Sequence, residues 1–575
     1  MLRQARRSSW CLVLLLTSWP LLSTASAPEG ASKAAALNDE FSWHKITPSD
    51  DLIWHDCYSG HQCARLKVPL DYENPDGASA AIAMRRIHSV VPHDSPEYRG
   101  PILVNPGGPG GSGVDFIQRL GDNVSAVVGP EFDIIGFDPR GISRSTPRAS
   151  FFENRAEQNL FWSNSGNSIT ASSSDDALAR MWAQGMLVGR LAGERDDGNL
   201  RFIHSDYTAR DMLRIVEAHG REKIQYWGFS YGSVLGATFA AMFPDKVGRL
   251  VIDGVADSEN YYAAEWSNNL MDAEKVWTAF LHGCVAAGPT KCAIYSPTAA
   301  EIQATVDDLY DSLRARPIPV RTATSYGIVD YDLMRNTIFG SLYKPYASFP
   351  VLARALADLS AGNATGLYKM SEAPFFKCSC DLDEFSFENV NDGGLAVRCN
   401  DGKRISSEFE DVEKHYGNLL ANSSWADVWM GTRLACMTWP EFPKTNFHGP
   451  FVANTSFPLL VVGNSADPVT PLWAAKKMSK GFSGSVVLTQ DSIGHCSLAA
   501  PSLCTQKHIR SYFRDGVLPE AGTVCSTDGG PFDTLLEGEE EGAAQAVLGS
   551  FSAEDQTLLE AVQGLARAWD VPLGM

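Results

Sequence analysis

The sequence lacks an excess of basic residues. It contains 48 Lys and Arg against 68 Asp and Glu, which gives a formal charge of −20 and a pI near 5.1. A protein that binds nucleic acid needs a basic surface to neutralise phosphates. The composition therefore argues against a nucleic-acid partner and favours a small or neutral substrate.

Long apolar runs are also missing after the first residues. The apolar run over residues 10–22 is shorter than the roughly 20 residues that a membrane-spanning helix needs. Three arginines precede it, and the small residues 23–27 supply a cleavage site. We expect residues 1–27 to be a secretory signal peptide, with a membrane anchor as the alternative. No membrane anchor is expected in the mature form, which is predicted to be secreted and extracellular.

The chain has neither the glycine content of collagen nor the polarity of a disordered protein. Hydrophobic residues make up 44% of its 575 residues, and we find no internal repeat. A single hydrophobic core stops growing at about 250–300 residues. The length therefore predicts a globular protein with more than one core region.

Cysteines indicate disulfide bonds, because an exported protein folds in an oxidising compartment. Without Cys11 in the signal peptide, an odd number remains from the total of 12, so at least one is unpaired. Spacing and position suggest four pairs: Cys57–Cys63, Cys284–Cys292, Cys399–Cys436 and Cys504–Cys525.

Metal ligands are scarce around the remaining cysteines. Cys378 and Cys380 have the spacing of a zinc site, but no histidine lies nearby at ligand spacing, so we expect no metal.

Four Asn-x-Ser/Thr triplets fit a secreted glycoprotein, although each could arise by chance. They begin at Asn123, Asn363, Asn422 and Asn454.

Strands and helices alternate along much of the chain. This pattern predicts an α/β fold with a mostly parallel sheet flanked by helices, after two antiparallel strands within residues 61–90. The other expected strands are 101–105, 132–138, 223–228, 248–253, 457–463 and 485–489, with helical periodicity over 207–220.

The alternation lapses between residues 253 and 457 and then resumes. We interpret residues 259–456 as an inserted helical cap with helices such as 263–287 and 299–316, and a separate domain is the alternative. The core then comprises residues 28–258 and 457–525. Residues 526–575 carry ten acids and one base, and we interpret them as a solvated acidic tail with a possible amphipathic helix after Ser552.

The motif Gly228-Phe-Ser230-Tyr-Gly232 follows a predicted strand and precedes an apolar helix. A nucleophile at such a turn needs glycines on both sides, because side chains there would collide with neighbouring backbone. The five-residue pattern alone is weak evidence in a chain this rich in glycine. Its position between strand and helix predicts that Ser230 is a nucleophile.

A serine nucleophile needs a histidine base that is oriented by a carboxylate. In this fold the chain order is Ser, then Asp or Glu, then His. Asp467 and His495 each follow a late strand, where α/β sheets place their sites. The alternatives are a turn aspartate before proline for Asp467 and a surface histidine for His495, with His448 as the nearest rival base.

The glycine-rich loop 105–113 is the third catalytic element. Its backbone N–H groups could stabilise an oxyanion, with Gly108 preferred over Gly107 as one donor and the Tyr231 N–H as the second. The loop also matches the dinucleotide pattern G-x-G-x-x-G. That interpretation is weaker because the loop follows two antiparallel strands and is followed by the serine motif, and no cofactor is expected.

Several motifs together resemble the secreted tripeptidyl aminopeptidases and proline iminopeptidases, which are α/β-hydrolases. They are Asn-Pro-Gly-Gly-Pro-Gly-Gly-Ser-Gly at 105–113, Gly-Phe-Asp-Pro-Arg-Gly at 136–141, Gly-Phe-Ser-Tyr-Gly at 228–232, Phe-Pro-Asp-Lys-Val at 243–247, Asp-Gly-Val from 253 and Ala-Asp-Pro-Val-Thr-Pro at 466–471. Cys496 after the histidine and the acidic tail depart from the pattern.

This resemblance implies a serine exopeptidase that releases residues or tripeptides from a free N-terminus. Carboxylates in or near the cap would hold the substrate ammonium group, and Glu265, Asp272 and Glu274 are candidates on one predicted helix. An esterase, lactonase or thioesterase acting on a small metabolite is the first alternative. A catalytically inactive binding protein is the second.

Overall fold

The computed structural model describes most of the chain. The described residues are 41–58, 60–164, 169–371, 389–443, 446–533 and 552–569. The chain divides into two compact units, residues 1–41 and 42–575, and the features below belong to the second. The expected signal peptide and the Cys378–Cys380 pair lie outside the described residues.

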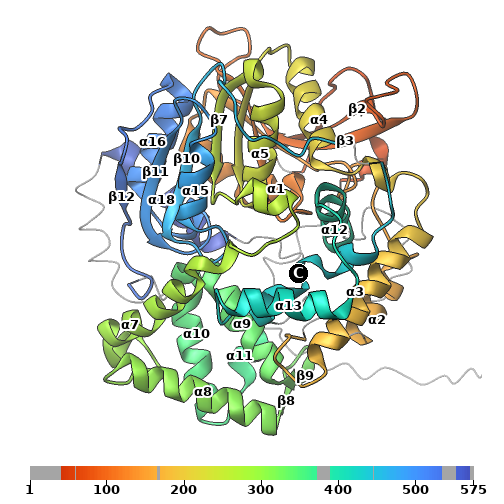
Figure 1. Ribbon diagram of the computed structural model, residues 1–575. Coiled ribbons are helices and arrows are strands. Elements are labelled where there is room, and N and C mark those ends of the chain that lie inside the picture. The colour runs from red at the N-terminus through yellow and green to blue at the C-terminus, as the bar shows by residue number, and fades with distance from the viewer. Residues whose placement is uncertain are drawn as a thin grey trace, which may run out of the picture. The chain divides into compact units, whose positions relative to one another are not determined.

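A ten-stranded sheet forms the centre, in the order β1-β2-β3-β5-β4-β6-β7-β10-β11-β12 (Figure 1). The pairs from β1 to β5 are antiparallel, and those from β5 to β12 are parallel. The mostly parallel sheet is therefore confirmed. The strands are β1 His55–Cys57, β2 His61–Pro69, β3 Ser79–Ile87, β4 Gly100–Asn105, β5 Phe132–Phe137, β6 Ile224–Phe229, β7 Val247–Asp253, β10 Leu460–Ala466, β11 Val486–Ile493 and β12 Val524–Ser526.

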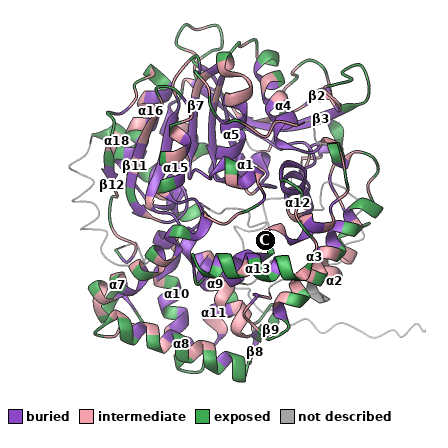
Figure 2. Ribbon diagram, viewed as in Figure 1, coloured by how far each residue is buried: buried purple, intermediate pink, exposed green. Residues whose placement is uncertain are grey.

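Both faces of the sheet are covered, so its central strands are buried throughout (Figure 2). On β4, Ile102 and Val104 join the hydrophobic cluster on one face, and Leu103 joins the cluster on the other. This alternation explains why the central strands are continuous apolar runs. The first cluster includes α1 Gly113–Val128, α16 Leu503–Asp515 and α18 Ala553–Ala568; the second includes α4 Ser205–Ala218, α5 Tyr231–Met242 and α15 Leu472–Ser479.

A helical insertion lies between β7 and β10, drawn mostly in green and cyan in Figure 1. The expected helix over residues 263–287 begins only at Ala273, because a 3₁₀ turn at Asn269–Asp272 precedes α7. The described elements are α6 Ser258–Tyr262, α7 Ala273–Lys291, α8 Ala299–Ala315, β8 Ile318–Arg321, β9 Tyr326–Val329, α9 Tyr331–Tyr343, α10 Pro345–Ser360, α11 Thr365–Met370, α12 Val390–Asp401, α13 Phe409–Leu420, α14 Ala426–Trp429 and the 3₁₀ helix η6 Met430–Thr438.

Two helices lie upstream of the serine motif, α2 Arg155–Asn164 and α3 Ala177–Glu194, and α3 packs against this insertion. A Cβ on Gly189 of α3 would lie 2.3 Å from the Ala435 carbonyl oxygen of η6, so the two helices pack at backbone distance. The sequence interpretation placed all of residues 28–258 in the core and missed this contact.

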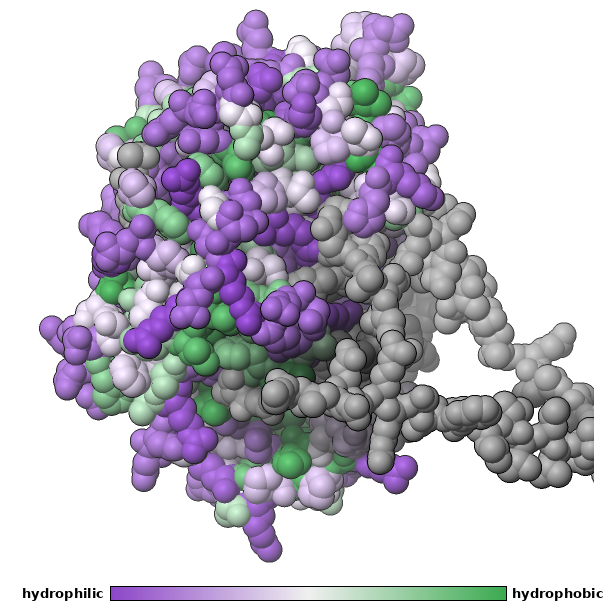
Figure 3. Space-filling model, turned by 90° about the vertical axis from the view of Figure 1, so that its right-hand side faces the viewer, coloured by the Kyte–Doolittle hydropathy of each residue, from purple (hydrophilic) through white to green (hydrophobic). Residues whose placement is uncertain are grey.

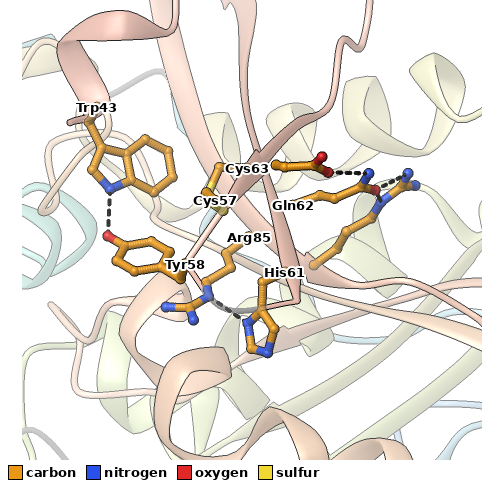
Figure 4. The surroundings of a disulfide bond; sticks show 9 residues. Trp43, Cys57, Tyr58, His61, Gln62, Cys63 and Arg85 are labelled. Atoms are coloured by element: carbon orange, nitrogen blue, oxygen red, sulfur yellow. Dashed lines mark hydrogen bonds between the residues drawn. A yellow bond between two sulfur atoms is a disulfide. The ribbon is translucent and has the colours of Figure 1, made fainter. Parts of the chain in front are cut away.

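All four predicted disulfide bonds are present, and Cys496 is a buried free cysteine. Figure 4 shows the first of them, which joins Cys57 at the end of β1 to Cys63 in β2. Beside it, the Trp43 indole N–H donates to the Tyr58 hydroxyl at 3.1 Å, and the Arg85 guanidinium lies 4.0 Å from the Tyr58 ring centre. The bond thus fixes an aromatic and cationic cluster at one edge of the sheet.

The C-terminal helix is confirmed, but it is not a solvated appendage. The Ser552 hydroxyl caps its first turn by accepting from the Asp555 N–H at 3.1 Å. One face of α18 is buried on the core, and Trp569 at its end is only 1% exposed. Acidic residues dominate the composition of residues 526–575, and for that reason the sequence analysis interpreted them as solvated and did not predict that this face is buried.

The surface of the described part is mainly hydrophilic on the face drawn in Figure 3, with hydrophobic side chains in small groups. None of the helices in the described ranges is both long and apolar enough to span a bilayer.

Candidate active site

Ser230 lies at the sharp turn between β6 and α5. Its φ is +57°, a conformation that non-glycine residues rarely adopt and that clusters at functional sites. A Cβ on Gly228 would lie 2.4 Å from the carbonyl oxygen of Gly232, and a Cβ on Gly232 would lie 2.8 Å from the carbonyl oxygen of Asn105. These two close approaches explain why the motif has glycine on both sides of Ser230.

The glycine-rich loop after β4 packs directly against this turn. A Cβ on Gly107 would lie 2.8 Å from the Ser230 Cβ and 3.2 Å from the Tyr231 backbone nitrogen. The Gly107 N–H donates to the side-chain oxygen of Asn105 at 3.0 Å. Because that N–H is engaged, Gly108 is the better of the two candidate oxyanion donors.

The side chains of His495 and Asp467 are in contact and fully buried. His495 Nδ1 lies 3.0 and 2.9 Å from the two Asp467 carboxylate oxygens. The carboxylate also accepts from the N–H groups of Val469, Thr470 and Cys496 and from the Thr470 hydroxyl. These donors hold Asp467 in one orientation, so it can orient the imidazole in turn.

The histidine loop and the nucleophile turn meet at Asp253, the last residue of β7. The Asp253 carbonyl oxygen accepts from the Ser230 N–H at 3.0 Å and lies 3.6 Å from Cys496 Sγ. His495 Nε2 is buried and has no hydrogen-bond partner among the described residues. The nitrogen that would act on Ser230 therefore forms no hydrogen bond with any described group, the Ser230 hydroxyl included.

Cys496 follows the histidine with a φ of +63°. Burial raises the pKa of its thiol well above the usual value, so the sulfur stays protonated and is a poor nucleophile. Burial also raises the pKa of the Asp253 carboxyl to about 6. The Ser497 N–H and hydroxyl both donate to this carboxyl, which ties the loop to β7.

A buried polar network behind the turn was missed by the sequence analysis. The hydroxyls of Tyr231 and Ser205 lie 2.6 Å apart, and Ser205 donates to the carboxylate of Asp401. Tyr261 also donates to Asp401 at 2.8 Å. Asp401 lies in α12, far away in sequence, and no local motif marks it as a partner of Tyr231.

The same helix also contacts the glycine-rich loop. A Cβ on Gly110 would lie 2.3 Å from the carbonyl oxygen of Val390, the first residue of α12. Helix α12 therefore supports both the loop with Gly108 and the turn with Tyr231.

The three candidate carboxylates for the substrate ammonium group do not share one helix. Glu265 precedes the 3₁₀ turn that contains Asp272, and only Glu274 lies in α7. Asp272 pairs with Lys275, and Glu274 accepts from the Ser423 hydroxyl and the Ser424 N–H. Glu265 is the most exposed of the three, with Arg433 3.7 Å away.

Two clusters in the described part have the residue types of metal ligands, but their atoms are otherwise engaged. In the first, Cys504 and Cys525 form a disulfide beside His508. In the second, Asp467 contacts His495 Nδ1 and accepts from the backbone N–H of Cys496, while Cys496 Sγ lies 3.6 Å from the Asp253 carbonyl oxygen. Neither cluster supports a metal site.

The sheet order, the strained serine turn after β6 and the acid and histidine after β10 and β11 define an α/β-hydrolase fold. The predicted fold class is thus confirmed. A family model described as alpha/beta hydrolase fold matches residues 100–291, and a second, described as TAP-like protein, matches residues 422–525.

Curated relatives extend this similarity over most of the chain. The tripeptidyl aminopeptidase of Streptomyces lividans is 28% identical, covering 84% of this chain and 87% of the relative. The serine protease Hip1 of Mycobacterium tuberculosis is 26% identical, covering 81% and 87%. Carboxylesterase B of the same species is also 26% identical, covering 81% and 86%. The resemblance to the tripeptidyl aminopeptidases is therefore confirmed.

Proposed function

We propose that the protein is a serine aminopeptidase in which Ser230, His495 and Asp467 form the catalytic triad. Ser230 attacks the substrate carbonyl while His495 Nε2 accepts the hydroxyl proton, and Asp467 orients the imidazole and stabilises its charged form. The observation that carries the proposal is the strained Ser230 turn, packed against the glycine loop and joined to the histidine loop at Asp253.

The oxyanion of the tetrahedral intermediate would be stabilised by the N–H groups of Gly108 and Tyr231. Removal of one such donor typically costs about 3 kcal/mol of transition-state stabilisation. Collapse of the intermediate expels the amine, which takes a proton from His495 and leaves an acyl-enzyme on Ser230. Water activated by His495 then hydrolyses this ester and restores the serine.

Peptides with a free N-terminus are the proposed substrates. The names of the relatives in Streptomyces and Mycobacterium support a peptidase, and the tripeptidyl aminopeptidase supports release from the N-terminus. The four disulfide bonds support folding in an oxidising compartment, in agreement with the proposed secretion.

A panel of chromogenic aminoacyl and tripeptidyl amides, with N-acetylated versions, tests this function. Ser230→Ala should lower kcat by at least about 10³-fold, because the nucleophile is lost. Ser312→Ala, at an exposed position in the helix α8, is the matched control and should retain full activity. Turnover by Ser230→Ala above a few per cent of the wild-type rate would refute the role of Ser230.

An esterase is the second candidate, favoured by the similarity to carboxylesterase B. The same catalytic groups cleave esters more easily than amides, so simple esters belong in the panel. Cleavage of free but not N-acetylated peptide amides identifies an aminopeptidase. Hydrolysis of esters alone would identify an esterase.

A further inference from the structure

The C-terminal helix α18 is docked beside the candidate active site. Its apolar face packs on α1, and its acidic start pairs with basic residues of α16. Arg510 lies 2.8 Å from Glu554, and Lys507 lies 2.6 Å from Asp555. The buried residues of the helix are Leu558, Leu559, Ala561, Val562, Leu565 and Ala566.

Trp569 is inserted where this helix ends. Its ring lies 5.3 Å from the ring of Phe229, the residue before Ser230, and 6.3 Å from the ring of Phe116 in α1. Its indole N–H donates to the carbonyl oxygen of His495 at 3.0 Å. One side chain therefore contacts the chain at both the proposed nucleophile and the proposed base.

The backbone of the histidine loop is held by hydrogen bonds on several sides. The His495 N–H donates to the carbonyl oxygen of Tyr343 at 2.8 Å. The side-chain amide of Asn464 donates to the carbonyl oxygens of Gly494 and Cys496. The Trp569 indole N–H donates to the buried carbonyl oxygen of His495 itself. Without this donor the carbonyl would be buried and unpaired, which would destabilise the present conformation of the histidine loop.

We propose that Trp569 is a positioning residue for His495. By fixing the His495 peptide and the ring of Phe229, it holds the His495 imidazole and the Ser230 turn in fixed positions relative to each other. The role rests on the proposed function of Ser230 and His495. It makes Trp569, which follows the last residue of the docked helix, a required support of the active site.

Trp569→Phe in the full-length protein tests the proposal, because phenylalanine keeps an aromatic ring in the site and removes only the indole N–H and some of the ring area. We expect kcat on the best peptide amide to fall by about tenfold, since small displacements of a catalytic group are costly. KM should change by less than about twofold, because the substrate-binding groups are untouched.

Leu558→Ala is the matched control. Leu558 is buried in the same helix, so its truncation lowers the melting temperature, but it lies in the first half of the helix, away from Trp569, and should leave kcat unchanged well below the melting transition. Unchanged kcat in Trp569→Phe would overturn the proposal, as would equal kcat losses in both variants. An inactive Ser230→Ala with a fully active Trp569→Phe rejects the positioning role alone, whereas an active Ser230→Ala rejects the proposed function as well.

Discussion

Buried carboxyl groups in this protein differ in how many hydrogen bonds they accept. Asp467 accepts hydrogen bonds from three backbone N–H groups, a hydroxyl and the imidazole. Asp392, in the first turn of α12, accepts from the Phe151 N–H at 3.0 Å with one oxygen, while the other oxygen is buried without a partner among the described atoms. Burial raises the pKa of Asp392 to about 7, against the weaker opposing effects of the hydrogen bonds from Phe151 and Gln158 and of the Arg148 charge.

Asp392→Asn should therefore stabilise the protein at alkaline pH. The folded chain holds the Asp392 proton to a higher pH than the unfolded chain, so stability falls as the pH rises from about 4 to 7. At pH 8 the loss is at most about 4 kcal/mol. Melting curves of the variant and the wild type should nearly coincide near pH 4 and separate at pH 8, with the variant melting higher.

Asp308→Asn, which removes an exposed carboxyl in α8, is the control and should show no such separation. A difference between Asp392→Asn and the wild type that is the same at both pH values would contradict the burial argument.

At this scale the sequence indicated the residues proposed for catalysis better than the residues that contact them. Ser230, Asp467 and His495 each follow a strand in a recognisable motif, which local sequence can reveal. Asp401 and Trp569 act through contacts with residues far away in the chain. No spacing rule connects such residues, so the sequence analysis missed both.

Among the elements, eight of the ten strands of the central sheet were predicted, because these strands are short apolar runs bounded by turns. The three-residue edge strands β1 and β12 were not predicted. The insertion was harder to predict. Its helices pack on one another and on α3 through surfaces that no simple periodicity marks. Helix α7, for example, follows a 3₁₀ turn that the apolar pattern of residues 263–287 conceals.

Two helix glycines make the packing of the insertion testable. Gly189 of α3 lies against the backbone of η6, whereas a Cβ on Gly340 of α9 would meet nothing within 4 Å. Gly340→Ala should stabilise the protein by about 0.5–1 kcal/mol, the usual gain from alanine in a helix. Gly189→Ala should destabilise it by about 1–3 kcal/mol, because the new methyl group overlaps the Ala435 carbonyl.

Thermal unfolding of the two variants in parallel provides the measurement. Stabilisation by both substitutions would show that α3 and η6 do not pack at backbone distance, because the helix preference for alanine would then act alone.

At the scale of the whole molecule, the packing of α18 makes one of the four potential glycosylation sites less accessible than the others. Asn363, Asn422 and Asn454 are exposed. The amide nitrogen of Asn123 in α1 lies 2.9 Å from the position of a Cβ on Gly564 in α18. An N-linked glycan is attached through that nitrogen, so it would occupy the space of the docked helix.

We therefore expect active protein from a glycosylating host to carry glycans at the three exposed sites and none at Asn123. Peptide mapping by mass spectrometry of the active fraction checks this. Asn123→Gln should leave activity unchanged, with Asn363→Gln as the control. Complete glycosylation of Asn123 in fully active protein would contradict the docked position of α18.

Trp569 follows every residue proposed for catalysis, and 74 residues separate it from His495. A protease that cuts the chain between His495 and α18 would leave all the proposed catalytic side chains intact. Once α18 is released, the donor to the His495 carbonyl is lost with it. Such a cut would therefore inactivate the protein without altering a catalytic residue.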